Sequence, residues 1–337
     1  GLPGTIVPPI VALGNARRYN HGSGQGRSEW PHAHSTSDRM RHLATFLQVV
    51  SALFVLACTD ARSKSAPRAH APAATGSEIT FPVSWPYPST NRAATAEHGM
   101  VATDAPLATH VGAAVLRDGG NAVDAAVATA FALAVVYPGA GNIGGGGFLV
   151  VHMGDGREET LDFRETAPGA ASRDMYLGAN GHADDRSITG ALSAGVPGSV
   201  MGLWDAHERY GSLQWARLLA PAIELADKGF VVDSDFAGSI HGDSARLARF
   251  PASAALFFPG GHVPAPGDRW RNSDLAAVLR RIASDGPKGF YAGRTAALIA
   301  AEMRRSHGNL SLADLSGYRA KWRSPIEFTY RGPRVVS

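Results

Sequence analysis

The segment that most constrains the fold is a glycine-rich turn between a helix and a strand. Residues 139–147 read GAGNIGGGG, which contains the spacing G-x-G-x-x-G of dinucleotide-binding proteins. In those proteins the glycines follow a strand and open a helix, whose N-terminal amides meet a pyrophosphate. Here residues 121–138 have large apolar side chains at helical spacing, and residues 148–153 (FLVVHM) are typical of a strand. The reversed order argues against a nucleotide site and a dinucleotide-dependent oxidoreductase, and no P-loop lysine follows.

The basic charge lies in the N-terminal part of the chain. The net charge of the 337 residues is +3, and residues 1–92 hold nine Lys and Arg against four Asp and Glu. The remainder is nearly balanced, so it has no basic surface of the kind that binds nucleic acid. We therefore expect no nucleic-acid partner.

The only cysteine, Cys58, ends a segment that resembles a signal peptide. Met40 and two basic residues precede an apolar run over residues 44–57, which is shorter than the ~20 residues of a membrane-spanning helix. The run ends in Val-Leu-Ala-Cys58, which resembles the lipobox of bacterial lipoproteins, so Cys58 is the predicted lipid attachment residue. Thr59 in place of an acidic residue points to the outer membrane. An ordinary cleaved signal peptide, or a buried helix with a free cysteine, are the alternatives.

These features divide the chain into four parts. Residues 1–39 lack apolar periodicity and precede the signal-like segment, so we expect a non-native or disordered extension. Residues 40–58 form the lipoprotein-like signal peptide, and the Ser-, Ala- and Pro-rich residues 59–92 form a flexible tether. Residues 93–337 form the folded domain. The predicted location is the periplasm or cell envelope, with an N-terminal lipid anchor.

The sequence pattern of the folded domain predicts both helices and antiparallel strands. Gly154, Asp155 and Gly156 predict a tight hairpin between strands at 148–153 and 159–163. We further expect a short strand at 99–103, followed by a helix with Thr103 or Asp104 as its N-cap and Pro106 in its first turn. The later part of the domain predicts an amphipathic helix capped by Asn272 or Ser273, a capping box at Ser311–Asp314, and a strand over 326–332. This pattern predicts a layered α/β or α+β fold rather than a doubly wound parallel sheet.

Arg164 is the candidate binding residue. It follows the second strand of the hairpin, and its guanidinium is suited to a bidentate contact with a carboxylate. Spacing alone favours a local ion pair with Asp162 or Glu165 instead. His98, His110 and His207 are isolated, and no metal-binding or nucleophile-elbow motif occurs, so we expect no metal and no cofactor.

Several ordered motifs together resemble the γ-glutamyltransferase (glutathione hydrolase) family. The resemblance runs from about Glu97 to Val336. It includes GMVATDAPLATHVGAAVLRDGGNAVDAAVATAFALAVVYPGAGNIGGGGFLVV, LDFRETAP, SAGVPGSVMG, LLAPAIELADKGF, GPKGFYAG, LADLSGY and SPIEFTYRG. The family uses a similar helix, glycine turn and strand without a nucleotide.

The resemblance implies an N-terminal nucleophile (Ntn) hydrolase with an α+β layered αββα sandwich, made as a precursor that cuts itself into two subunits. In the family, the N-terminal threonine of the small subunit attacks a γ-glutamyl amide, and the acyl-enzyme passes to water or an amino acid. The implied partners are glutathione or other γ-glutamyl compounds and a small subunit from the same precursor. The arginine of the DFRE motif, here Arg164, holds the glutamyl α-carboxylate.

The family's nucleophile belongs after a Pro-rich segment that would follow Val336. We therefore expect this chain to be an N-terminal large-subunit portion with an incomplete fold and no catalytic residue of its own. Thr329 is no substitute because it lies inside a strand-like run. The alternatives are a same-family acylase acting on β-lactam side chains, a poly-γ-glutamate transpeptidase, and an inactive truncated remnant.

Overall fold

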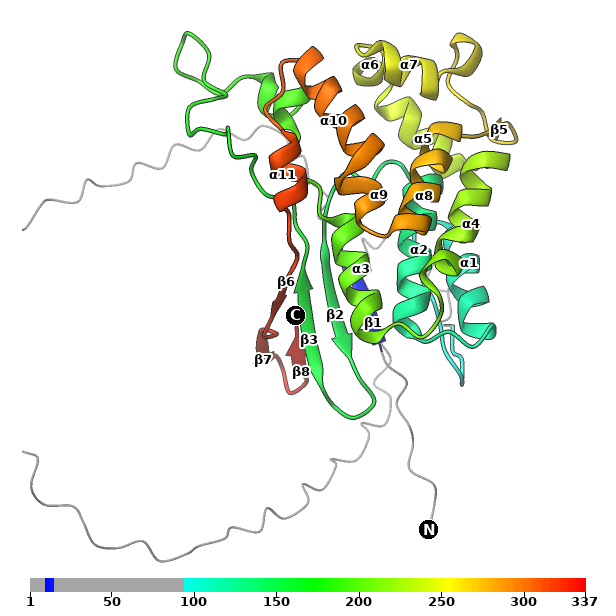
Figure 1. The fold of residues 1–337 in the computed structure, drawn as a ribbon. Helices are drawn as coiled ribbons and strands as arrows, with labels where there is room; N and C mark the ends of the chain where they lie inside the picture. The colour runs from blue at the N-terminus through cyan, green and yellow to red at the C-terminus, as the bar shows by residue number, and fades with distance from the viewer. Residues whose placement is uncertain (1–9, 15–93) are drawn as a thin grey trace, which may run out of the picture. The chain divides into compact units, whose positions relative to one another are not determined.

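The computed structural model of the chain describes residues 10–14 and 94–337 (Figure 1). The predicted signal peptide, the tether and Cys58 lie outside the described residues. Within the described part, no helix is both long enough and apolar enough to cross a membrane.

Four antiparallel strands form the main sheet, in the order β1-β2-β3-β6. They are β1 (Ile10–Gly14), β2 (Phe148–His152), β3 (Glu158–Asp162) and β6 (Lys321–Arg323). The predicted hairpin is confirmed, because β2 pairs with β3 in a register that sets Leu149 opposite Leu161. Both leucines are buried, so one face of the hairpin belongs to the apolar core.

The strand β1 was not expected. Its residues lie in the segment 1–39, for which the sequence predicts a disordered extension, yet their backbone pairs with β2. The sequence IVALG contains β-branched residues that suit a strand, and β2 presents an edge that can pair with it. The other residues of that segment lie outside the described part, so its predicted boundaries stay a prediction.

Helix α2 (Ala122–Val136) is the centre of the core. It is apolar on all sides, as is typical of a buried helix, and Phe131 and Val135 are fully buried. It packs against α1 (Pro106–Arg117), α3 (Ser199–Tyr210) and α4 (Trp215–Lys228). Phe131 meets the Trp215 ring edge-on, with 5.5 Å between ring centroids. The same apolar cluster includes the buried residues of the hairpin, so α2 is fixed relative to the sheet.

A buried carboxylate joins α2 to the loop after α3. Asn121 and Asp124 form a capping box at the start of α2, in which the Asp124 carboxylate accepts the Asn121 N–H at 3.0 Å. The same carboxylate accepts the N–H groups of Ser212 (3.0 Å) and Leu213 (3.3 Å). Asp124 is completely buried, and these donors take the place of water. The helix that leads into the glycine turn therefore starts from a fixed point.

The second half of the chain is mostly helical. As predicted, Asn272 caps α8 (Ser273–Asp285) by accepting the Leu275 N–H at 2.9 Å, and Ser311 and Asp314 form a capping box before α11 (Leu312–Gly317). Among residues 94–337 the remaining elements are α5 (Ser234–Gly242), α6 (Ser244–Leu247), α7 (Pro251–Phe257), α9 (Lys288–Tyr291), α10 (Gly293–Arg305), β4 (Phe230–Val231), β5 (Arg269–Trp270), β7 (Glu327–Thr329), β8 (Arg334–Val336) and the short 3₁₀ helices Asp185–Ser187, Ala191–Ser193 and Pro259–Gly261.

Two local predictions were wrong. Residues 99–103 form no strand, and the N-cap of α1 is Ala105, which makes no side-chain cap. Thr103 turns back on its own loop, where its hydroxyl donates to the Ala105 carbonyl at 2.8 Å. The predicted strand within 326–332 is confirmed only over β7, which pairs with β8 in a separate two-stranded sheet.

Candidate active site

The glycine turn packs directly against the end of β3. The Phe163 N–H donates to the Gly147 carbonyl at 3.0 Å, which continues the β2–β3 ladder by one pair. A Cβ on Gly146 would overlap the Phe163 carbonyl oxygen and lie 2.9 Å from the Arg164 Cα. The Gly145 carbonyl accepts the Gly198 N–H at 2.7 Å, at the start of α3. The glycines therefore allow three backbone segments to meet at Arg164, which explains them without a phosphate ligand.

The backbone of Arg164 is held on both sides. Its N–H donates to Asp162 Oδ1 at 3.0 Å, and its carbonyl accepts the Tyr318 hydroxyl at 2.9 Å. Asp162 also accepts from the Arg323 guanidinium, with 2.8 Å between Oδ2 and Nε. Burial alone would raise the pKa of Asp162, but the hydrogen bonds from Arg164 and Arg323 outweigh it and lower that pKa. Asp162 is therefore ionised at neutral pH and stays an acceptor for the Arg164 N–H.

The guanidinium of Arg164 keeps most of its donors for a ligand. Its Nε lies 3.4 Å from Glu165 Oε2, an ion pair that lacks the geometry of a hydrogen bond, and the Arg164 side chain is 42% exposed. The local ion pair that the spacing favours therefore exists. Such an exposed pair contributes little to stability. Among the described residues neither terminal nitrogen of Arg164 donates a hydrogen bond to a protein acceptor, so both can contact a carboxylate.

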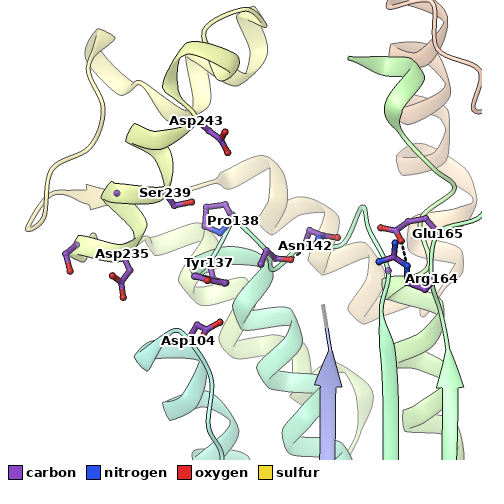
Figure 2. Close-up of a pocket in the computed structure, with 14 residues that line it drawn as sticks. Asp104, Tyr137, Pro138, Asn142, Arg164, Glu165, Asp235, Ser239 and Asp243 are labelled. Atoms are coloured by element: carbon purple, nitrogen blue, oxygen red, sulfur yellow. Dashed lines mark hydrogen bonds and ion pairs between the residues drawn. The ribbon is translucent and has the colours of Figure 1, made fainter. Parts of the chain in front are cut away.

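A cavity of about 830 Å³ opens in front of Arg164. The glycine turn forms part of its wall, and α5 forms another part. Figure 2 shows Arg164 and Glu165 on one side of this space, with three aspartates at a distance from them on the other. These aspartates are Asp104, Asp235 and Asp243. The volume lies in the range of sites for small molecules, so the cavity can take a substrate of peptide size.

The other sequence candidates do not join this cavity. His110 Nδ1 lies 2.7 Å from the Pro106 carbonyl oxygen in its own helix, and His207 Nε2 lies 2.8 Å from the Leu213 carbonyl oxygen. Thr329 lies on the exposed strand β7. In the part of the chain that the structure describes, no group of three His, Cys, Asp or Glu side chains could hold a metal ion.

Tyr318 and the three aspartates were missed by the sequence analysis. Tyr318 belongs to the motif LADLSGY, but its contact with Arg164 spans 154 residues, and no periodicity reports it. Asp104 was interpreted as a possible helix cap, whereas it lines the cavity. Asp243 pairs with Arg246 at 2.6 Å, so its local partner gives no sign that it lines a cavity.

Comparisons with known proteins identify the family. A family model described as gamma-glutamyltranspeptidase matches residues 108–337. This chain belongs to that family. It is 48% identical over 242 residues to a glutathione hydrolase proenzyme of Pseudomonas aeruginosa, covering 71% of this chain and 42% of the relative. It is 42% identical over 250 residues to an acylase ACY 1 proenzyme of Pseudomonas sp. strain V22, covering 72% and 45%.

The fold agrees with this assignment. The crystal structure of Helicobacter pylori gamma-glutamyltranspeptidase matches with a TM-score of 0.71 and 40% identity, covering 73% of this chain and 71% of that one. The fold is thus that of the γ-glutamyltranspeptidases, an Ntn hydrolase fold. The chain spans about two fifths of the length of the curated glutathione hydrolase proenzymes it matches.

We predict that Gly146→Ala lowers the free energy of unfolding of this γ-glutamyltranspeptidase family chain by about 2–3 kcal/mol. The added methyl group must displace either the turn or the backbone of Phe163 and Arg164. The control is Gly144→Ala in the same turn, where a Cβ has open space and the expected change is below about 1 kcal/mol in either direction. Urea denaturation measures the free energy of unfolding of both variants. An equal decrease in the two variants would contradict the close approach of backbone segments at Gly146.

Proposed function

We propose that this chain is the large-subunit portion of a γ-glutamyltransferase and glutathione hydrolase. In this proposal Arg164 binds the α-carboxylate of a γ-glutamyl group in the cavity beside the glycine turn. One observation carries the assignment of Arg164: its backbone is fixed on both sides while the terminal nitrogens of its guanidinium donate no hydrogen bond to a protein acceptor among the described residues. The family match supplies the class of substrate.

The proposed whole protein has the layered αββα architecture of an autoprocessed precursor. The relatives named proenzymes support processing into a large and a small subunit. The N-terminal threonine of the small subunit, with its α-amine as base, would attack the γ-glutamyl carbonyl carbon. The amide C–N bond then breaks, and the leaving amine takes a proton. Water or an amino acid resolves the acyl-enzyme.

The residues described here would bind and orient the substrate rather than react with it. A bidentate contact with the α-carboxylate fixes one end of the glutamyl group, so that its γ-carbonyl lies at a defined distance from Arg164. Such positioning converts binding energy into a favourable geometry for attack. No cofactor or metal takes part in the proposed reaction.

An acylase is the second candidate, since one relative is an acylase ACY 1 proenzyme. The exposed end of the Arg164 guanidinium favours a γ-glutamyl substrate, because a γ-glutamyl group carries an α-carboxylate three carbons from the scissile amide carbonyl. The two candidates are separated by comparing the rates at which the enzyme hydrolyses γ-glutamyl-p-nitroanilide and a β-lactam side-chain amide. A γ-glutamyltransferase prefers the first substrate, and an acylase prefers the second. An inactive remnant would leave both substrates uncleaved.

We predict that Arg164→Lys in the processed enzyme raises KM for γ-glutamyl-p-nitroanilide by about 10- to 100-fold. Lysine keeps the charge but replaces a bidentate contact by a single point charge. Steady-state kinetics measure the change. The control is Arg173→Lys, because Arg173 is 93% exposed and does not line the cavity. If KM for Arg164→Lys stays at the wild-type value, Arg164 does not bind the carboxylate.

We also propose that the protein is exported and held at the outer membrane by a lipid on Cys58. The signal-like segment 40–58 and its lipobox-like end support this location. Cys58→Ser should move the enzyme from the membrane pellet to the soluble fraction and abolish labelling by radioactive palmitate. A variant that stays membrane-bound and labelled would rule out Cys58 as the anchor.

A further inference from the structure

The direction of the Arg164 side chain depends on where its backbone is held. Strand β3 ends at Asp162, and Arg164 lies at the start of a loop. A loop residue can change its backbone direction unless both its peptide groups have partners. Local sequence supplies one partner, Asp162. The second partner, Tyr318, comes from the other half of the chain, at the end of α11.

Tyr318 is itself held in a rigid environment. It is only 4% exposed, and its ring stacks on the Tyr291 ring at 5.9 Å between centroids with an interplanar angle of 5°. The Tyr291 hydroxyl donates to the Pro197 carbonyl at 2.9 Å and accepts the Met201 N–H at 3.2 Å. The pair of rings therefore ties α11 to the start of α3, and the Tyr318 hydroxyl has a fixed position.

The Tyr318 hydroxyl occupies space that a side chain on Gly198 would fill. A Cβ on Gly198 would overlap both the Tyr318 hydroxyl oxygen and the Phe163 carbonyl oxygen. Gly198 is also the residue whose N–H binds the carbonyl of Gly145 in the glycine turn. Tyr318 thus reaches Arg164 at the point where the turn, the end of β3 and α3 meet.

The hydroxyl is a donor throughout the physiological pH range. Burial raises the pKa of Tyr318, and the nearby carboxylates of Asp162, Glu165 and Asp205 raise it further. The phenol therefore keeps its proton. The Arg164 carbonyl, which has no proton of its own, is always the acceptor.

We propose that Tyr318 is a positioning residue, whose hydroxyl fixes the Arg164 backbone so that the guanidinium meets the substrate carboxylate in the bidentate orientation. The inference rests on the proposed function, since it needs Arg164 to bind that carboxylate. Tyr318 does not line the cavity, so it acts through Arg164 and not on the substrate. Loss of the hydroxyl should weaken substrate binding without slowing the chemical step.

The test is Tyr318→Phe in the processed enzyme, which keeps the stacked ring and removes only the hydroxyl. We expect KM for γ-glutamyl-p-nitroanilide to rise about 5- to 20-fold, with kcat within about twofold of wild type. The matched control is Tyr176→Phe. Tyr176 donates a hydrogen bond of similar length, 2.8 Å, to the Leu192 carbonyl and does not line the cavity. Its KM should not change, although both variants lose one partly buried hydrogen bond.

A double variant separates positioning from a general loss of stability. If Tyr318 acts through Arg164, Tyr318→Phe adds less than about twofold to KM in the Arg164→Lys background. Full additivity, or an unchanged KM in the single Tyr318→Phe variant, overturns the inference while the role of Arg164 stands. If Arg164→Lys itself leaves KM unchanged, the proposed function of Arg164 fails and the positioning role fails with it.

Discussion

The site depends on one close approach, that of the glycine turn to the backbone of Phe163 and Arg164. No side chain fits between these segments at Gly146 or at Gly198, so the turn, the end of β3 and the start of α3 pack as backbone on backbone. Buried backbone groups must be paired, and here they pair with one another across the three segments. This arrangement leaves the Arg164 side chain as the polar group that reaches outward into the cavity.

The features that the sequence predicted correctly are those set by neighbouring residues. The helix α2 within residues 121–138, the β2–β3 hairpin and the caps at Asn272 and Ser311 follow from spacing and capping within a few positions. The order helix, turn, strand is also confirmed, and it is the reverse of the order around the glycines of dinucleotide-binding proteins. The family's fold, in contrast, came from resemblance, because local patterns do not specify which helices cover which face of a sheet.

The features that were missed depend on contacts between distant parts of the chain. Tyr318 reaches Arg164 across 154 residues, and Asp124 is buried against a loop 88 residues away. Asp235 on α5 and Asp104 in the loop before α1 line the same cavity as the glycine turn, and no spacing encodes this arrangement. The N-cap of α1 was wrong because Thr103 has a closer backbone partner in its own loop. Side chains with a competing local acceptor are poor guides to helix starts.

The central claim is that Arg164 binds the α-carboxylate of the γ-glutamyl group. A crystal structure of the processed enzyme with bound L-glutamate tests it most directly. The account predicts that the α-carboxylate makes two hydrogen bonds of about 2.7–2.9 Å with the Arg164 guanidinium. It also predicts that the contacts of the Arg164 backbone with Asp162 and Tyr318 persist. A glutamate whose α-carboxylate is held elsewhere, with Arg164 paired only to Glu165, would contradict the account.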